Sequence, residues 1–281
     1  MKPICPLMIA ISCLLANVEG TAATYSWDFR NGHFDNLSLV PMGAGAVNLL
    51  QPNRDGLQVE VPAKYDLKTV GFSPRFTLKG DFEITLDFTI VGRSKPAKGF
   101  GTGPSLYLST GSTSDSAASL GRLLRTDGRD IYAVFAARVE NGVRHPSAKL
   151  IDAPPGQRIT GRLQLKRVKD EITYSVSDDL TAPLRQIAAL PMDAGEITLL
   201  RIGVSQSSPD SAAKVILHKI QIDADELPHL PSEQSRTAQL YRPRYLAPPP
   251  PQSLRWLWQS LAAVAVICLA GGWWWKRKQT R

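Results

Sequence analysis

Apolar and polar residues alternate with a period of two through much of the chain between Thr24 and Pro231. The clearest stretch is 82–90, where every even position is apolar and every odd position is polar. A period of two predicts a β-strand that buries one face and exposes the other to water. Shorter strand-like runs occur at 57–61, 105–110, 131–139, 162–166, 171–176, 197–206 and 214–223.

Turn-forming pairs stand between these runs, among them Asn31-Gly32, Asp55-Gly56, Asp127-Gly128 and Asn141-Gly142. No stretch of comparable length keeps a helical period with caps, apart from one apolar segment near the C-terminus. Many short strands separated by turns predict an all-β fold, either a sandwich or a barrel. We assign this β-sandwich ectodomain to residues 24–231.

The N-terminus has the pattern of a cleaved secretory signal. Lys2 precedes a mostly apolar run over residues 4–18, and small residues follow it. We therefore predict a signal peptide over residues 1–23. A lipoprotein signal with Cys13 as the lipidated residue is the alternative, but the apolar run continues beyond that cysteine.

The apolar segment near the C-terminus has the length of a membrane span. Residues 256–275 are almost entirely apolar, tryptophans mark both ends, and Lys-Arg-Lys follows. About 20 apolar residues cross a bilayer as a helix, and tryptophan gathers at its two interfaces. We predict a Pro-rich stalk over 232–254, a transmembrane helix over 255–275 and a basic cytoplasmic tail over 276–281. The alternative is a sorting signal that is removed in favour of another anchor.

Charge and cysteine content exclude several functions. The formal net charge is +8, but residues 24–253 hold 27 Lys and Arg against 24 Asp and Glu. This near balance gives little support to nucleic-acid binding. The three cysteines are Cys5, Cys13 and Cys268. The mature ectodomain therefore has no disulfide, thiol nucleophile or cysteine-bound metal.

The order of strands resembles a known family. The runs that carry the resemblance are 80–85 (Gly-Asp-Phe-Glu-Ile-Thr), 161–167, the hairpin 172–179, and the closing strands 200–205 and 220–223. They are similar to concanavalin A-like jelly-roll domains, as found in uncharacterised surface proteins of planctomycete-type bacteria. The resemblance implies a two-sheet jelly-roll sandwich, a scaffold that often binds or hydrolyses glycans. Fold alone does not establish an activity.

Glycoside hydrolases of the family-16 type, which share this fold, carry Glu-x-Asp-x-Glu on one strand. Here Glu83 and Asp87 share the polar face of one strand, with Thr85 between them and Thr89 next. This spacing departs from the motif, and a strand face in contact with water explains both carboxylates without catalysis. We therefore predict no catalytic residue and no enzymatic activity.

Histidine and aspartate give no clear metal site, and we predict no cofactor. The four histidines have no metal-ligand spacing, and His218 shares a face with isoleucines, as a structural histidine does; the others are His33, His145 and His229. Asp178-Asp179 and Asp223/Asp225 are the candidates for a calcium site, but acidic residues are common in turns. The glycine-rich stretch 99–104 has no helix after it, so we expect a loop between strands and not a phosphate site.

Aromatic and basic residues bear on glycan binding. The ectodomain has one tryptophan, Trp27, which we assign to the core. The tyrosines that remain as candidates for sugar contact are Tyr65, Tyr107, Tyr132 and Tyr174. A basic group could favour an acidic polymer, although a solvated strand face is the ordinary explanation; its members are Arg138, Arg162, Lys166, Arg167 and Lys169.

Together these patterns predict a single-pass membrane protein with its N-terminal domain outside the cytoplasm. We expect that domain to be a non-catalytic binding or adhesion module whose partner is an envelope glycan or a surface protein. One alternative is a polysaccharide-acting enzyme of the glycoside hydrolase kind. The other is a structural component of the cell envelope.

Overall fold

The structure is a computed structural model that describes residues 22–43, 46–65, 69–111, 116–156 and 158–231. The chain divides into two units, 1–231 and 232–281. The predicted stalk, span and tail, and all but the last two residues of the predicted signal peptide, lie outside the described residues. Within the described ranges, no helix has the length and apolar character needed to cross a membrane.

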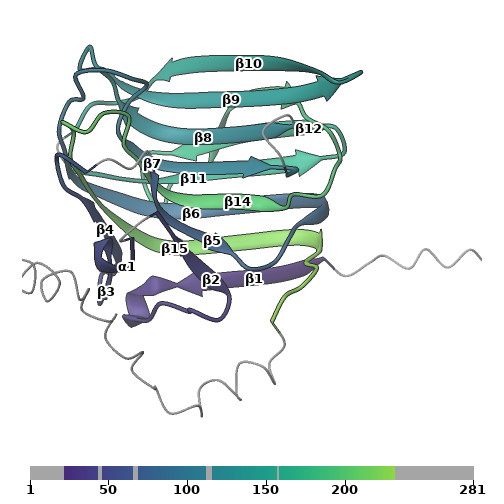
Figure 1. Cartoon of the computed structure of the whole chain (residues 1–281), viewed down its shortest axis with the longest axis horizontal. Helices are drawn as coiled ribbons and strands as arrows, with labels where there is room; N and C mark the ends of the chain where they lie inside the picture. The colour runs from purple at the N-terminus through teal and green to yellow at the C-terminus, as the bar shows by residue number, and fades with distance from the viewer. Residues whose placement is uncertain (1–21, 44–45, 66–68, 112–115, 157, 232–281) are drawn as a thin grey trace, which may run out of the picture. The chain divides into compact units, whose positions relative to one another are not determined.

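The described part consists of two antiparallel sheets (Figure 1). Sheet A has eight strands, and seven of them follow one another in the order β13 (Arg185–Pro191), β12 (Glu171–Ser177), β11 (Ile159–Val168), β6 (Lys79–Arg93), β15 (Ala213–Glu226), β4 (Gly56–Val61) and β3 (Leu50–Asn53). The eighth, β1 (Ala23–Asp28), also pairs with β15.

Sheet B has seven strands in the order β10 (Val143–Asp152), β9 (Asp130–Glu140), β8 (Ala117–Leu124), β7 (Gly103–Ser109), β14 (Leu199–Ser205), β5 (Thr69–Pro74) and β2 (Leu39–Met42). The helical elements in the described part are short: a 3₁₀ turn, η1 (Phe29–Asn31), and one turn of α-helix, α1 (Ala46–Leu49). The chain crosses repeatedly between the sheets, since β6 lies in sheet A and β7 in sheet B.

Strand β6 shows how the alternating pattern produces the fold. Its apolar even positions, from Phe82 to Ile90, are at most 3% exposed, whereas Glu83, Thr85 and Asp87 are half-buried on the other face. Most buried apolar side chains of both sheets form one continuous cluster, and Leu123, Ile131 and Ala133 form a small second one. Burial of apolar area on this scale is the main driving force for folding. The predicted all-β, two-sheet jelly-roll sandwich is confirmed.

Trp27 lies in the core, as the sequence predicts. It is 5% exposed, its ring stacks on Phe76 at 5.8 Å, and its indole N–H donates to Ser38 Oγ at 2.9 Å. The sheets are also joined by a polar contact, because Tyr174 Oη of β12 donates to the Phe135 carbonyl of β9 at 2.7 Å. Tyr174 is therefore part of the interior and does not contact solvent.

Four strands of sheet B are absent from the sequence prediction: β2, β5, β8 and β10. Strand β8 is buried on both faces along most of its length, so its sequence has no alternation. Strand β10 lies at the sheet edge and is exposed at nearly every position, so it has no apolar face. The turn before β10 is as expected, since Asn141 and Gly142 both have positive φ, the requirement of a tight hairpin turn.

A buried ionic cluster links the sheets beside β8 and β9. Arg93 of β6 pairs with Asp130 of β9, and Arg122 of β8 pairs with Asp178 after β12. Arg122 also donates to the hydroxyl of Tyr132 at 2.6 Å, which in turn donates to Asp178 at 2.6 Å. Burial raises the pKa of Tyr132, so the phenol stays protonated and remains a donor. Buried charges of this kind persist only when paired.

Candidate functional site

A cavity of about 400 Å³ lies on the outer face of sheet B, and we call it the sheet-B cavity. Its volume is within the range of small-molecule binding sites. Strands β7, β8, β9 and β14 supply most of its lining, and β5, the segment before β7 and the segment after β14 supply the rest. The lining residues are Thr69, Phe100, Gly101, Ser105, Leu106, Tyr107, Ser119, Leu120, Gly121, Leu123, Ala133, Val134, Phe135, Arg201, Ser205, Gln206 and Ser207.

The floor of the cavity is a row of small residues that crosses the strands. The strand registers pair Gly203 with Ser105, Ser105 with Gly121, and Gly121 with Ala133. On the far side of β14, Gly203 pairs with Gly71, and a Cβ on either glycine would overlap the neighbouring strand's backbone. Small residues in one row leave a depression that runs at right angles to the strands.

A second row forms one wall. Arg201 pairs with Tyr107, Tyr107 with Ser119, and Ser119 with Phe135. The Tyr107 and Phe135 side chains are both half-buried. They lie two strands apart, about 9.6 Å between backbones at the usual strand spacing. The wall therefore presents two aromatic rings with a serine hydroxyl between them.

The glycine-rich stretch before β7 forms the other wall. The Gly101 N–H donates to Ser207 Oγ at 2.7 Å, and Thr102 exchanges two backbone hydrogen bonds of 3.0 Å with Leu124. Gly101 has φ of +146°, and a Cβ there would contact Leu123 Cβ at 2.8 Å, so only glycine fits. Phe100 in this segment is 55% exposed. The predicted loop is present, and it is fixed to β8 and to the segment after β14.

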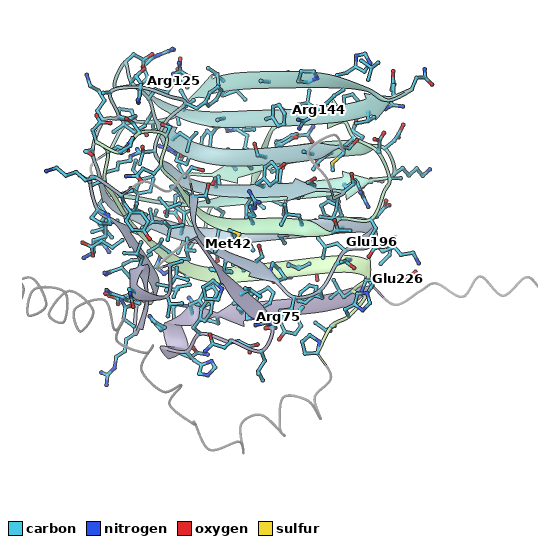
Figure 2. All side chains as sticks on the ribbon, viewed as in Figure 1. Met42, Arg75, Arg125, Arg144, Glu196 and Glu226 are labelled. Atoms are coloured by element: carbon cyan, nitrogen blue, oxygen red, sulfur yellow. The ribbon has the colours of Figure 1, made fainter. Side chains whose placement is uncertain are left out.

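Arg201 is the only charged side chain in the lining, among the residues that the structure describes. Two further arginines lie against aromatic rings of the cavity: Arg125 is 5.6 Å from the Phe100 ring centroid, and Arg144 is 5.8 Å from that of Phe135. Figure 2 shows both arginines on the side of sheet B that carries β9 and β10. The described lining contains no Asp or Glu.

Glu83 and Asp87 lie elsewhere, on the outer face of sheet A. Glu83 accepts from Gln164 Nε2 at 2.8 Å and pairs with Lys166 at 3.3 Å, so it belongs to a solvated polar face. Asp87 differs, because burial raises its pKa while the nearby Arg162 and other cations partly oppose that effect. The structure brings neither carboxylate to the sheet-B cavity.

The other sequence candidates have structural partners. His218 Nε2 lies 2.7 Å from Thr89 Oγ1 and its Nδ1 lies 2.7 Å from the Asp55 carbonyl, so the predicted structural role is confirmed. Asp178 belongs to the ionic cluster, and Asp223 accepts from Thr24 at 2.5 Å. Within the described residues, no three His, Cys, Asp or Glu side chains form a group that could hold a metal.

Some of the candidate basic and aromatic residues are buried, and one of the tyrosines lines the cavity. Arg167 was expected on a solvated face, and this is wrong: it is 1% exposed and donates to the Gly195 carbonyl at 2.6 Å. The strand alternation places it on the inner face, where main-chain carbonyls satisfy it. Of the four candidate tyrosines, Tyr107 lines the cavity, Tyr132 and Tyr174 are buried, and Tyr65 packs against the core.

Sequence reasoning did not identify Arg201, Ser119 or Phe135 as neighbours. Each lies on a different strand, and only the register brings them into one row. The usable signal was the glycine-rich stretch 99–103, because closely spaced glycines mark close approach of a backbone.

A family model matches most of the sequence. It is described as "Protein of unknown function (DUF1583) C domain" and matches residues 9–246. No curated protein matches the sequence.

Solved structures show the same fold. The apo Crh5 transglycosylase superposes with a TM-score of 0.50 at 11% identity, covering 74% of this chain and 86% of its own. LamAcat from Zobellia galactanivorans superposes with a TM-score of 0.53 at 9% identity, covering 72% of this chain and 97% of its own. At such identities the likeness establishes the concanavalin A-like fold.

These matches overturn one prediction. The expectation that the domain is not an enzyme is wrong, because the folds that it matches include that of a transglycosylase. The prediction rested on the absence of the Glu-x-Asp-x-Glu motif around Glu83 and Asp87, and the absence of one family's motif does not exclude an enzyme.

Proposed function

We propose that this chain, which belongs to the DUF1583 C-domain family, acts on a polysaccharide that it holds in the sheet-B cavity. The observation that carries the proposal is the row Arg201, Tyr107, Ser119 and Phe135 beside a floor of small residues. Aromatic faces pack on the apolar faces of sugar rings, and hydroxyl and guanidinium groups hydrogen-bond sugar hydroxyls. The arrangement across the strands suits an extended chain of linked sugars.

The reaction class that we propose is glycoside hydrolysis or transglycosylation. Its support is the likeness in fold to the Crh5 transglycosylase. Both reactions ordinarily use two carboxyl groups on either side of the scissile bond. The described lining of the sheet-B cavity contains no Asp or Glu, so the carboxyl groups of the reaction are not among these lining residues. Burial raises the pKa of Asp87, as in a general acid, but Asp87 lies on sheet A, so a test must separate the two faces.

The test compares two tryptophan variants of the full chain. Ser119→Trp fills the sheet-B cavity, and Ser175→Trp places the same bulk on the outer face of sheet A as a matched control, since both serines are half-buried in mid-strand. Binding to a panel of soluble polysaccharides, release of reducing ends, and transfer to a labelled sugar acceptor are measured.

The expected result is that Ser119→Trp abolishes binding and turnover and that Ser175→Trp retains both. Loss of turnover in Asp87→Asn or Ser175→Trp, with Ser119→Trp unaffected, would move the site to sheet A and refute the proposal. Binding without any turnover would refute its catalytic part.

We further propose that the domain lies outside the cytoplasm and is tethered by the segment 255–275, as in the planctomycete-type surface proteins that it resembles. The support is the sequence: a signal-like N-terminus and 20 almost entirely apolar residues bounded by tryptophans. Protease added to intact cells should degrade the domain. A protected, uncleaved protein in the soluble fraction would contradict this location.

A further inference from the structure

We infer that the sheet-B cavity selects acidic sugars through Arg201. This inference rests on the proposed function and names its substrate class. Arg201 is the one charged side chain among the described lining residues, and no described carboxylate lines the cavity to neutralise it. A cavity with a single sign of charge favours a ligand of the opposite sign.

Arg201 is exposed, yet a neighbouring side chain holds it in place. It stands opposite Tyr107 in the register, and its guanidinium carbon lies 5.7 Å from the Tyr107 ring centroid. A guanidinium over an aromatic face is attracted to the ring while its edge N–H groups stay free to donate. A contact of this kind with the ring uses no N–H donor, so the donors of Arg201 remain available to a ligand.

Several other arginines near the surface have acidic partners. Arg30 pairs with Asp28, Arg129 with Asp127 at 3.0 Å, and Arg138 with Glu140 at 3.2 Å. Within the described ranges, Arg201 has no such ion pair. An arginine placed in a cavity without a protein counter-ion is available for an anionic group of the ligand.

The borders of the cavity add to this positive field. Arg125 and Arg144 lie against the rings of Phe100 and Phe135, and both rings line the cavity. Arg125 is also 3.8 Å from Asp127. Charges of one sign around a cavity attract ligands of the opposite sign, most strongly at low ionic strength.

The chemistry that fits is a sugar with a carboxylate or sulfate group. Its ring would stack on Tyr107 or Phe135, and its anionic group would accept two parallel N–H bonds from Arg201. A neutral sugar of the same length would keep the stacking and lose the charged contact. The cavity should therefore discriminate between matched acidic and neutral chains.

The experiment measures binding of the full chain, in detergent, to three oligosaccharides of equal length: a uronic-acid oligomer, a sulfated oligomer and a neutral oligomer. Arg201→Gln removes the charge, Arg201→Lys keeps it, and Arg185→Gln on β13 is the matched control for an exposed arginine on sheet A. Each titration is repeated at low and high salt.

Wild type should bind at least one acidic oligomer about ten- to a hundredfold more tightly than the neutral one, and salt should weaken only the acidic binding. Arg201→Gln should remove this difference, Arg201→Lys should keep part of it, and Arg185→Gln should leave it unchanged. The acidic oligomer whose affinity falls in Arg201→Gln shows whether Arg201 binds a carboxylate or a sulfate group.

Two results separate failure of this inference from failure of the proposed function. Equal binding of all three oligomers, or equal weakening of all three by Arg201→Gln, would overturn the selectivity and leave the glycan site standing. No binding of any oligosaccharide would overturn the proposed function, and this inference with it.

Discussion

The buried ionic cluster beside the cavity gives the sharpest test of the structure. The side chains of Arg93 and Asp130 are only 5% and 6% exposed, and that of Arg122 is 1% exposed and lies 3.9 Å from Asp130. Asp130→Asn keeps the shape of the side chain and removes its charge. Arg93 would then lose the carboxylate that it pairs with, and Arg122 would keep Asp178, whose side chain is 37% exposed.

The expected cost follows from this burial. Removing one partner of a buried ion pair costs about 3–5 kcal/mol, because the remaining charge has no compensation inside the protein. A domain of this size loses about 2–4 °C in Tm for each kcal/mol. Asp130→Asn should therefore lower the Tm by about 6–20 °C.

Thermal and urea unfolding of the fragment 22–231, followed by circular dichroism, measure this cost. Asp127→Asn is the matched control, because Asp127 pairs with Arg129 on the surface with side chains 43% and 57% exposed. Exposed pairs contribute little to stability. If Asp130→Asn is no more destabilising than Asp127→Asn, the reasoning about a buried, mutually dependent cluster is refuted.

Three further predictions concern single residues. Trp27→Ala should cost about 3–5 kcal/mol in urea unfolding, since Trp27 is 5% exposed; a loss no larger than that of the exposed Val47→Ala would contradict its core position. Gly203→Ala should abolish cooperative unfolding or expression, because its Cβ would overlap the Val70 carbonyl; wild-type stability would exclude the register of β14 and β5. Asp87→Asn should be more stable than wild type near pH 7, because burial raises the pKa of Asp87 and this penalises its charged form. Protonated Asp87 carries no such penalty, so wild type is at its most stable below the ordinary pKa of 3.8 and loses stability as the pH rises through the folded-state pKa. The free energies of unfolding of the two proteins should therefore converge near pH 3. A difference that stays constant with pH would argue against ionisation as the cause.

Much of the fold could be predicted from the sequence because burial on one face imposes a period of two. This holds for β6, β11, β12 and β15, which have one apolar and one polar face. It fails for β8, whose outer face lies under the glycine-rich segment, and for β10, which has little apolar surface to bury.

The candidate site could not be predicted because it depends on register. Arg201 and Tyr107 are far apart in the sequence, and a shift of one residue in either strand would place them on opposite faces. The buried position of Arg122 could not be predicted either, because a charged residue in an apolar run is ordinarily assigned to the surface. Its partner Asp130 lies on the neighbouring strand β9, and its partner Asp178 follows β12 of the other sheet, so strand pairing and sheet packing bring them together.

The exposed strand β10 has a consequence for how the molecule behaves at high concentration. An edge strand can recruit the edge of another molecule and start a continuous intermolecular ladder. Pro146 in β10 has no N–H to offer such a ladder, and Arg144 and Lys149 add repulsion between identical copies. Replacing these three residues with valine should convert a monodisperse preparation into fibrils that bind thioflavin, so the proline and the two cations protect the solubility of a domain whose edge is otherwise open.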